Sequence, residues 1–152
     1  MALLDTNVLV HASYRGSPLH AAAAQLVDRG LRENRAFCIS PQVLVEFAAV
    51  ATRKRFVNPP LSGDEVLKKT DLLYRSRRLV KLYPARGTVM RAIRAGVALG
   101  VTGPRWYDLF LAVTMREAGV TTIVTEDFTH FSGFGFLNVL HIQEASEQEL
   151  DA

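Results

Sequence analysis

Short apolar runs alternate along this chain with longer segments in which apolar residues recur at helical spacing. The apolar runs predict β-strands at about residues 2–4, 37–39, 79–83, 121–125 and 139–142; residues 121–125 are all β-branched. The periodic segments predict helices at about residues 6–14, 19–34, 41–55, 62–77, 88–99 and 104–118. Residues 126–135 are predicted to form a loop. Strands separated by helices favour a parallel sheet covered on both faces.

Helix ends are marked by residues that satisfy free backbone groups. The predicted N-terminal signals are Thr6 or Asn7 for the first helix, Ser17 before Pro18, Ser40 before Pro41, and Ser62 with Glu65 as a capping box. Gly100 and Gly119 are predicted to close two later helices in the left-handed conformation. We find no internal repeat and no linker, so residues 1–143 are expected to form a single domain followed by an acidic tail at residues 144–152.

Composition fits one globular domain, because the chain has 152 residues and 49% are hydrophobic. No run approaches the roughly 18 apolar residues of a membrane span, and the N-terminus lacks the basic segment of a signal peptide. The single cysteine, Cys38, has no partner for an internal disulfide. We therefore expect a cytoplasmic protein with no membrane association.

Charge is unevenly distributed, although the net value is only +3. Between Val50 and Arg105 there are 13 Lys or Arg residues against three acids, whereas seven acids and no basic residue follow from Glu117 onward. The basic middle is suited to phosphate backbones, and ordinary solvated helix faces explain it equally well. The acidic segment 144–151 is expected to be a frayed end.

Four acids lie inside or beside apolar elements instead of on solvated faces: Asp5, Glu46, Asp108 and Asp127. Asp5 follows the first predicted strand, and in open α/β sheets ligands collect just past the carboxyl ends of the strands. Converging carboxylates repel one another unless a cation neutralises them, and Mg²⁺ or Mn²⁺ prefer such oxygen ligands. Each acid alone is also consistent with a structural role, such as a helix cap for Asp5 or a solvated helix edge for Glu46.

A carboxylate-held ion beside a basic surface suggests phosphodiester hydrolysis by metal-activated water, with one ion or with two about 4 Å apart. No zinc pattern and no Ser or Cys nucleophile motif is present. RNA would be held by a subset of the basic residues Arg53, Lys54, Arg55, Arg77, Arg78, Arg86, Arg91 and Arg94. Trp106 and Tyr107 are candidates for stacking on a base, with core packing as the alternative.

Four parts of the chain together resemble the PIN-domain family. They are Asp5-Thr6-Asn7-Val8-Leu9-Val10, a helical Glu46, Trp106-Tyr107-Asp108-Leu109-Phe110-Leu111-Ala112 and Thr125-Glu126-Asp127-Phe128. In size and order the chain is most similar to single-domain VapC-type ribonuclease toxins. The resemblance implies a three-layer α/β/α sandwich with a mainly parallel sheet, and Mg²⁺- or Mn²⁺-dependent cleavage of RNA. It also implies a homodimer and inhibition by a VapB-type antitoxin.

Carried over by position, Asp5, Glu46, Asp108 and Asp127 would be the catalytic, metal-binding acids, with Asn7 and Thr125 as polar supports. Asp127 is favoured by the family pattern over its neighbour Glu126, and the sequence leaves both open. Residues 56–64 match no motif.

Three other functions fit parts of the sequence. A haloacid-dehalogenase-type phosphotransferase needs a second Asp where this chain has Asn7, and a receiver module needs a late Lys, whereas none follows Lys81. A non-catalytic scaffold that binds RNA or a protein partner would use the basic middle equally well. Such a scaffold should keep its RNA affinity when the acids are removed, whereas hydrolysis should stop.

Overall fold

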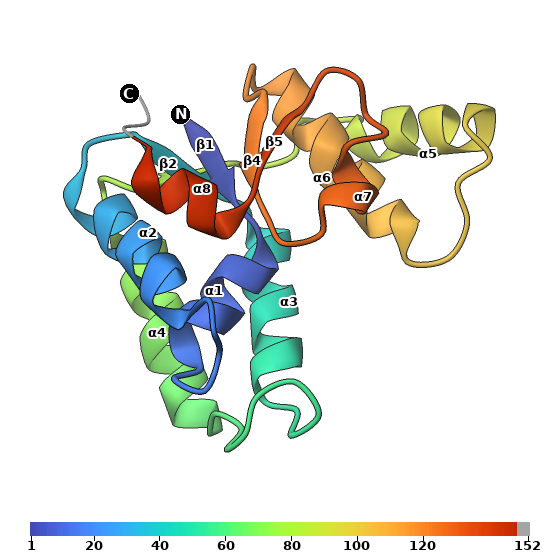
Figure 1. Ribbon diagram of the computed structural model, residues 1–152. Helices are drawn as coiled ribbons and strands as arrows, with labels where there is room; N and C mark the ends of the chain where they lie inside the picture. Colours follow the sequence, from blue (N-terminus) through green and yellow to red (C-terminus); the bar gives the residue numbers. More distant parts are fainter. Residues whose placement is uncertain (149–152) are drawn as a thin grey trace.

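The computed structural model describes residues 1–148, and at its centre lies a five-stranded sheet (Figure 1). The strands are β1 (Ala2–Leu4), β2 (Phe37–Ile39), β3 (Val80–Lys81), β4 (Thr122–Val124) and β5 (Asn138–Leu140). They lie in the order β3-β2-β1-β4-β5, and every neighbouring pair is parallel. The predicted α/β fold is therefore confirmed, with a sheet that is parallel throughout.

Helices flank the sheet on two sides. They are α1 (Thr6–Ser13), α2 (His20–Arg32), α3 (Pro41–Ala51), α4 (Gly63–Arg75), α5 (Thr88–Ala98), α6 (Arg105–Glu117), α7 (Phe128–Phe131) and α8 (Ile142–Glu147). Figure 1 shows α5, α6 and α7 grouped on one side of the sheet and α1, α2, α4 and α8 on the other. This division follows from right-handed crossovers, because the chain moves outward from β1 to β3 and then crosses to β4 and β5.

The order of the strands creates a point where the direction of the chain reverses. From β1 the chain proceeds to β2 and β3 on one side, while β4 pairs with the other edge of β1, with Leu4 opposite Val124. The residues that follow β1 and β4 therefore emerge side by side at the carboxyl edge of the sheet. Ligand sites of open α/β sheets form at such a reversal.

Most helix caps follow the local sequence, and two differ. Ser40 Oγ accepts from the Val43 amide at 3.2 Å, and Ser62 with Glu65 forms the predicted capping box. The first helix is capped by Asp5 instead of Thr6 or Asn7, because the Asp5 carboxylate accepts from the Thr6 amide at 2.7 Å. Ser17 does not cap α2 directly; its Oγ accepts from the Leu19 amide within the turn that precedes the helix.

Three predictions for the C-terminal part were wrong. The expected loop 126–135 contains the short helix α7, which buries Phe131 against the core. Ile142, expected to end the last strand, begins α8, and this helix packs on α2 with Ile142 and Ala145 buried. The acidic segment from Glu144 is thus helical to Glu147 instead of frayed; residues 149–152 of that predicted tail lie outside the described residues.

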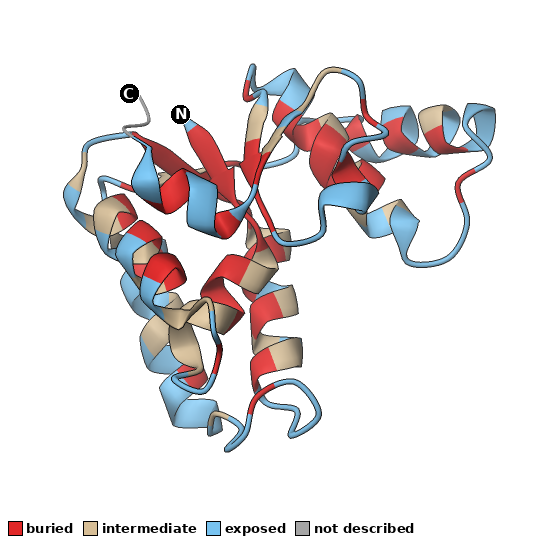
Figure 2. Ribbon diagram, viewed as in Figure 1, coloured by how far each residue is buried: buried red, intermediate tan, exposed pale blue. Residues whose placement is uncertain are grey.

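The core consists of the strands and the helix faces turned toward them (Figure 2). Every residue of β1 and β2 is at most 1% exposed. On the far side, α5 packs closely on α6, since a Cβ atom built on Gly96 would lie 2.3 Å from the Trp106 ring. No helix in residues 1–148 is long and apolar enough to cross a membrane.

Candidate active site

An open groove with a volume of about 820 Å³ lies at the carboxyl edge of β1 and β4. All four candidate acids line it, although they come from the end of β1, α3, α6 and the segment after β4. The groove is also lined by residues outside the acid set, among them Thr6, Asn7, His11, Arg53, Phe56 and Glu126. Side chains from four parts of the chain thus line one groove.

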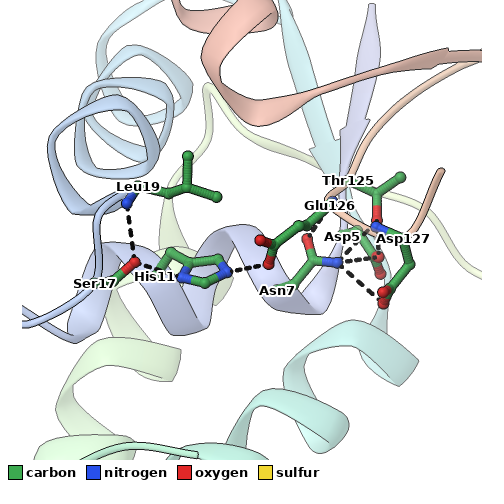
Figure 3. Close-up of polar contacts among 8 residues, drawn as sticks. All are labelled: Asp5, Asn7, His11, Ser17, Leu19, Thr125, Glu126 and Asp127. Atoms are coloured by element: carbon green, nitrogen blue, oxygen red, sulfur yellow. Dashed lines mark hydrogen bonds and ion pairs between the residues drawn. The ribbon is translucent and has the colours of Figure 1, made fainter.

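Asp5 is the most buried of the acids, with 6% of its surface exposed. Its Oδ1 accepts from the Thr6 amide at 2.7 Å. Its Oδ2 accepts from Thr125 Oγ1 at 2.7 Å, as Figure 3 shows. Burial raises the pKa of Asp5 to about 6; the two hydrogen bonds lower the pKa, and the charges of Glu46 and Asp127 raise it further. A carboxylate in this position is costly to ionise without a cation.

Asn7 joins the first helix to the segment after β4. Its Nδ2 lies 3.2 Å from Asp5 Oδ2, 2.9 Å from Thr125 Oγ1 and 3.3 Å from Asp127 Oδ2, so two amide hydrogens serve three acceptors. Its Oδ1 accepts from the Glu126 amide at 3.2 Å. Figure 3 shows this amide group at the centre of the network. Asn7 therefore links the Asp5 and Asp127 carboxylates through one amide group.

Thr125 is fully buried and completes that network. Its hydroxyl donates to Asp5 and also accepts from the Asp127 amide at 3.0 Å. Thr125 thereby fixes the position of the Asp127 backbone relative to the Asp5 carboxylate. Asn7 and Thr125 thus contact Asp5 and each other, and their supporting role in the site stays a prediction.

Glu46 lies on α3 and is held by two side chains. Thr6 Oγ1 donates to its Oε2 at 3.1 Å, and Gln42 Nε2 donates to its Oε1 at 2.8 Å. Gln42 Nε2 also donates to the Tyr107 carbonyl at 3.0 Å, which ties α3 to α6. The Gln42–Glu46 spacing of one helical turn explains their contact.

Asp108 lies in the first turn of α6, half-buried, with its Oδ2 3.4 Å from His130 Nδ1. Burial raises the pKa of Asp108; the charge of His130 lowers it, and the charges of Glu46 and Asp127 raise it. The charges of Glu46 and Asp127 therefore raise the pKa of both Asp5 and Asp108, so the four acids are electrostatically coupled.

The chemistry of these donors suits a hard divalent cation, because the groove offers carboxylate, amide and hydroxyl oxygens. As the side chains stand in residues 1–148, no group of three or more His, Cys, Asp or Glu residues meets the geometry of a formed metal site. The carboxylate oxygens instead accept hydrogen bonds: Asn7 donates to Asp5 and Asp127, and Thr6 donates to Glu46. Cys38 takes no part, since it is buried in β2 and burial raises the pKa of its thiol to about 12.

Sequence reasoning missed a second hydrogen-bonded chain beside the acids. His11 Nε2 lies 2.6 Å from Glu126 Oε2, and His11 Nδ1 lies 2.7 Å from Ser17 Oγ (Figure 3). The available signal was the spacing of Asn7 and His11, four residues apart and hence on one face of α1. Nothing in the sequence indicated which segment that face contacts.

The predicted RNA-contacting residues divide into several environments. Arg53 lines the groove, whereas Arg78 donates to the Arg32 carbonyl at 2.8 Å and Arg91 pairs with Glu117. Of the two aromatic candidates, Tyr107 is 65% exposed and lines the groove, while Trp106 packs against the core. Core packing therefore accounts for Trp106.

Comparison with known proteins gives consistent matches over most of the chain. A family model described as "PIN domain" matches residues 2–136. The chain is 34% identical over 141 residues to a protein of Mycobacterium tuberculosis named Ribonuclease VapC24, which covers 91% of this chain and 94% of that protein.

Solved structures share the fold at lower sequence identity. The structure of Mycobacterium tuberculosis VapC20, described as a Sarcin-Ricin loop cleaving toxin, superposes with a TM-score of 0.68 at 16% identity, covering 90% of this chain and 97% of that one. VapBC2 from Rickettsia felis, bound to a DNA fragment from its promoter, gives a TM-score of 0.61 at 19% identity, covering 92% and 97%.

Proposed function

This chain belongs to the PIN-domain family and is homologous to the VapC ribonucleases, and on that basis we propose that it is a Mg²⁺- or Mn²⁺-dependent endoribonuclease, the toxin of a toxin–antitoxin pair. The observation that carries the proposal is that four acids, from four separate parts of the chain, line one groove at the reversal of the sheet. Carboxylates that share one groove, with Asp5 buried among them, favour a multivalent cation.

Asp5, Glu46, Asp108 and Asp127 are the residues that would hold the ion. When bound, a divalent cation there supplies Lewis-acid chemistry, activating water and stabilising the charge that develops on the phosphate. Burial is the main cause of the raised pKa values of Asp5 and Asp108, and the ion would offset the further rise that the charges of Glu46 and Asp127 produce. The four acids are thus proposed as the catalytic and metal-binding set.

The remaining polar residues orient the acids. Asn7 and Thr125 direct the Asp5 and Asp127 carboxylates through hydrogen bonds, and Thr6 with Gln42 directs Glu46. His130 Nδ1 lies 3.4 Å from Asp108 Oδ2, and its charge lowers the pKa of Asp108. Arg53 adds positive charge along the same groove, where it would attract the phosphate backbone of RNA. Precise placement of acids by such supporting groups commonly affects activity by about 10–100-fold.

The partners are proposed from the same relationship. Structures that share the fold include toxin–antitoxin complexes, which supports a VapB-type antitoxin as the partner of this chain. We propose that the enzyme acts as a homodimer in the cytoplasm. Co-expression with the product of the neighbouring reading frame, followed by co-purification and size determination, tests both the partner and the dimer.

Cleavage of single-stranded RNA by the purified chain tests the activity. We expect hydrolysis with Mg²⁺ or Mn²⁺, none with EDTA, and none for Asp5→Asn or Asp108→Asn purified in parallel. Circular dichroism should show that both variants keep the fold, and calorimetric titration should show weaker Mn²⁺ binding by both. Wild-type rates in both variants, with contaminating nuclease excluded, would refute the assignment.

The alternative is a scaffold that binds RNA or a protein without turnover. It predicts that RNA affinity survives removal of the acids and that no cleavage occurs with either ion. The homology to ribonucleases favours the enzyme.

A further inference from the structure

Phe56 is an exposed aromatic residue in the same groove as the acids. Its surface is 44% exposed, and its ring belongs to neither the buried core nor the residues packed against that core. The next residue, Val57, is 1% exposed and does belong to the core. The fold therefore depends on Val57 at this point of the chain and not on the ring of Phe56.

The backbone fixes where this ring lies. After α3 ends at Ala51, the amides of Phe56 and Val57 donate to the Arg53 carbonyl at 3.0 and 3.1 Å. Leu61 then donates to the Ala51 carbonyl at 2.9 Å and closes the segment onto the end of α3. Phe56 is thus held at the groove by main-chain contacts and by the burial of its neighbour, and neither of these uses its side chain.

Two arginines accompany the ring. The guanidinium carbons of Arg53 and Arg55 lie over the Phe56 ring at 5.4 and 5.6 Å from its centroid. Both side chains are exposed, and neither forms an ion pair with an acid among residues 1–148. Their charges therefore remain available to an anionic ligand, and their planar groups, which lie over the ring, add stacking surfaces of their own.

We propose that Phe56, Arg53 and Arg55 form a subsite that stacks one unpaired base of single-stranded RNA and contacts its adjacent phosphates. The subsite rests on the proposed ribonuclease function and adds a binding position for the substrate outside the acid cluster. Nucleic-acid sites for single strands combine such features, since aromatic rings or arginine planes stack bases and positive charge follows the backbone. The segment 56–64, for which the sequence offered no motif, thereby gains a role.

Position in the groove favours RNA over an acidic peptide as the ligand. Phe56 and Arg53 line one continuous groove with Asp5, Asp108 and Asp127, so a strand stacked on Phe56 extends toward the acids. An RNA strand can share a divalent cation with these acids through its phosphates. An acidic peptide could share such an ion through its carboxylates, but it carries no base at each anionic group to stack on the ring.

Equilibrium binding to fluorescein-labelled single-stranded RNA tests the subsite. Full-length protein carrying Asp5→Asn serves as the parent in every arm, so that no turnover occurs and binding is measured even if the chain does not cleave RNA. Phe56→Ala should weaken binding by about 10-fold, the size expected for one stacked base, and Phe56→Trp should retain the parent affinity. Tyr74→Ala, an aromatic residue 52% exposed on α4 and outside the groove, is the matched control and should bind like the parent.

A second ligand separates stacking from a structural effect. With an oligomer of ribose phosphate that lacks bases, Phe56→Ala and the parent should bind equally, because no base is present to stack. Arg53→Ala and Arg55→Ala should weaken binding of both ligands and each reduce the slope of log affinity against log salt by about 1. Arg75→Ala on α4 is the control for charge.

Two results would overturn the subsite: unchanged RNA affinity in Phe56→Ala, or an equal loss on the oligomer without bases. Unchanged RNA affinity together with lost binding of an antitoxin would assign the surface to a protein partner and also overturn the proposal. Absence of cleavage by the wild type refutes the ribonuclease activity alone, since the binding arms do not depend on turnover.

Discussion

Glu126 and Asp127 are consecutive residues whose carboxylates contact different side chains of the same helix. Glu126 Oε2 lies 2.6 Å from His11 Nε2, whereas Asp127 Oδ2 lies 3.3 Å from Asn7 Nδ2 (Figure 3). Asn7 and His11 are one turn apart on α1, so each holds one of the two acids. Asn7 thereby links Asp127 to Asp5, and His11 links Glu126 to Ser17 by hydrogen bonds.

This division predicts unequal effects of two matched substitutions. Asp127→Asn should lower kcat for RNA cleavage by about 100-fold or more, because it removes a carboxylate of the proposed metal set. Glu126→Gln should lower it by less than about 10-fold, because its carboxylate faces His11. Cleavage rates on one RNA at saturating Mn²⁺ compare the two. A larger loss in Glu126→Gln would exchange the roles assigned to these neighbours.

The contact of His11 with Glu126 should be measurable as a coupling in stability. We expect His11→Ala to lower the free energy of unfolding by about 1 kcal/mol, since Glu126 and Ser17 both lose a hydrogen-bond partner. In a double-mutant cycle by urea denaturation, His11→Ala and Glu126→Gln should couple by about 0.5 kcal/mol or more. The cycle of His11→Ala with Asp127→Asn is the control and should be nearly additive. Equal coupling in both cycles would contradict the pairing.

The raised pKa of Asp5 predicts a pH dependence of stability in the metal-free protein. The pKa of Asp5 rises from 3.8 to about 6 because the residue is buried, so the folded state binds a proton more tightly than the unfolded state. Stability from this group is therefore present below about pH 4 and is lost as the pH rises through about 6. Asp5→Asn cannot ionise and lacks this loss.

Urea denaturation in EDTA from pH 4 to pH 7 measures that difference. Relative to Asp5→Asn, the wild type should lose on the order of 2–3 kcal/mol as the pH rises, and saturating Mn²⁺ at pH 7 should restore part of it. A constant difference across this range would show that Asp5 ionises as readily in the folded chain as in the unfolded one.

Packing between α5 and α6 predicts a strong effect of adding one methyl group. In Gly96→Ala the new Cβ would lie 2.3 and 2.6 Å from two atoms of the Trp106 ring, so the helices must separate or the ring must move. We expect a loss of about 1–3 kcal/mol in the free energy of unfolding. Gly63→Ala at the start of α4 meets no atom within 4 Å and should change stability by less than about 1 kcal/mol. Thermal denaturation compares them, and equal melting temperatures would contradict the close approach.

Local sequence was sufficient for the elements whose signals depend only on neighbouring residues. The β-branched run around Ile123 forms β4, and Ser62 with Glu65 forms the capping box, because these preferences arise from backbone geometry and near-neighbour hydrogen bonds. Asp5, Glu46, Asp108 and Asp127 were singled out in the same way, as acids in apolar surroundings. Gly100 and Gly119 adopt the positive φ angles expected of helix ends.

Tertiary structure alone decided the features that depend on distant partners. The helix α7 forms where the sequence predicted a loop, with Phe131 buried against the core, and α8 follows β5 because Ile142 and Ala145 pack toward α2. Neither Glu126 nor Asp127 carries a local signal for its partner, since adjacent side chains point in different directions and only the folded sheet brings α1 beside them. Sequence fixes what each residue can bind, and the packing of remote segments determines which of those contacts is made.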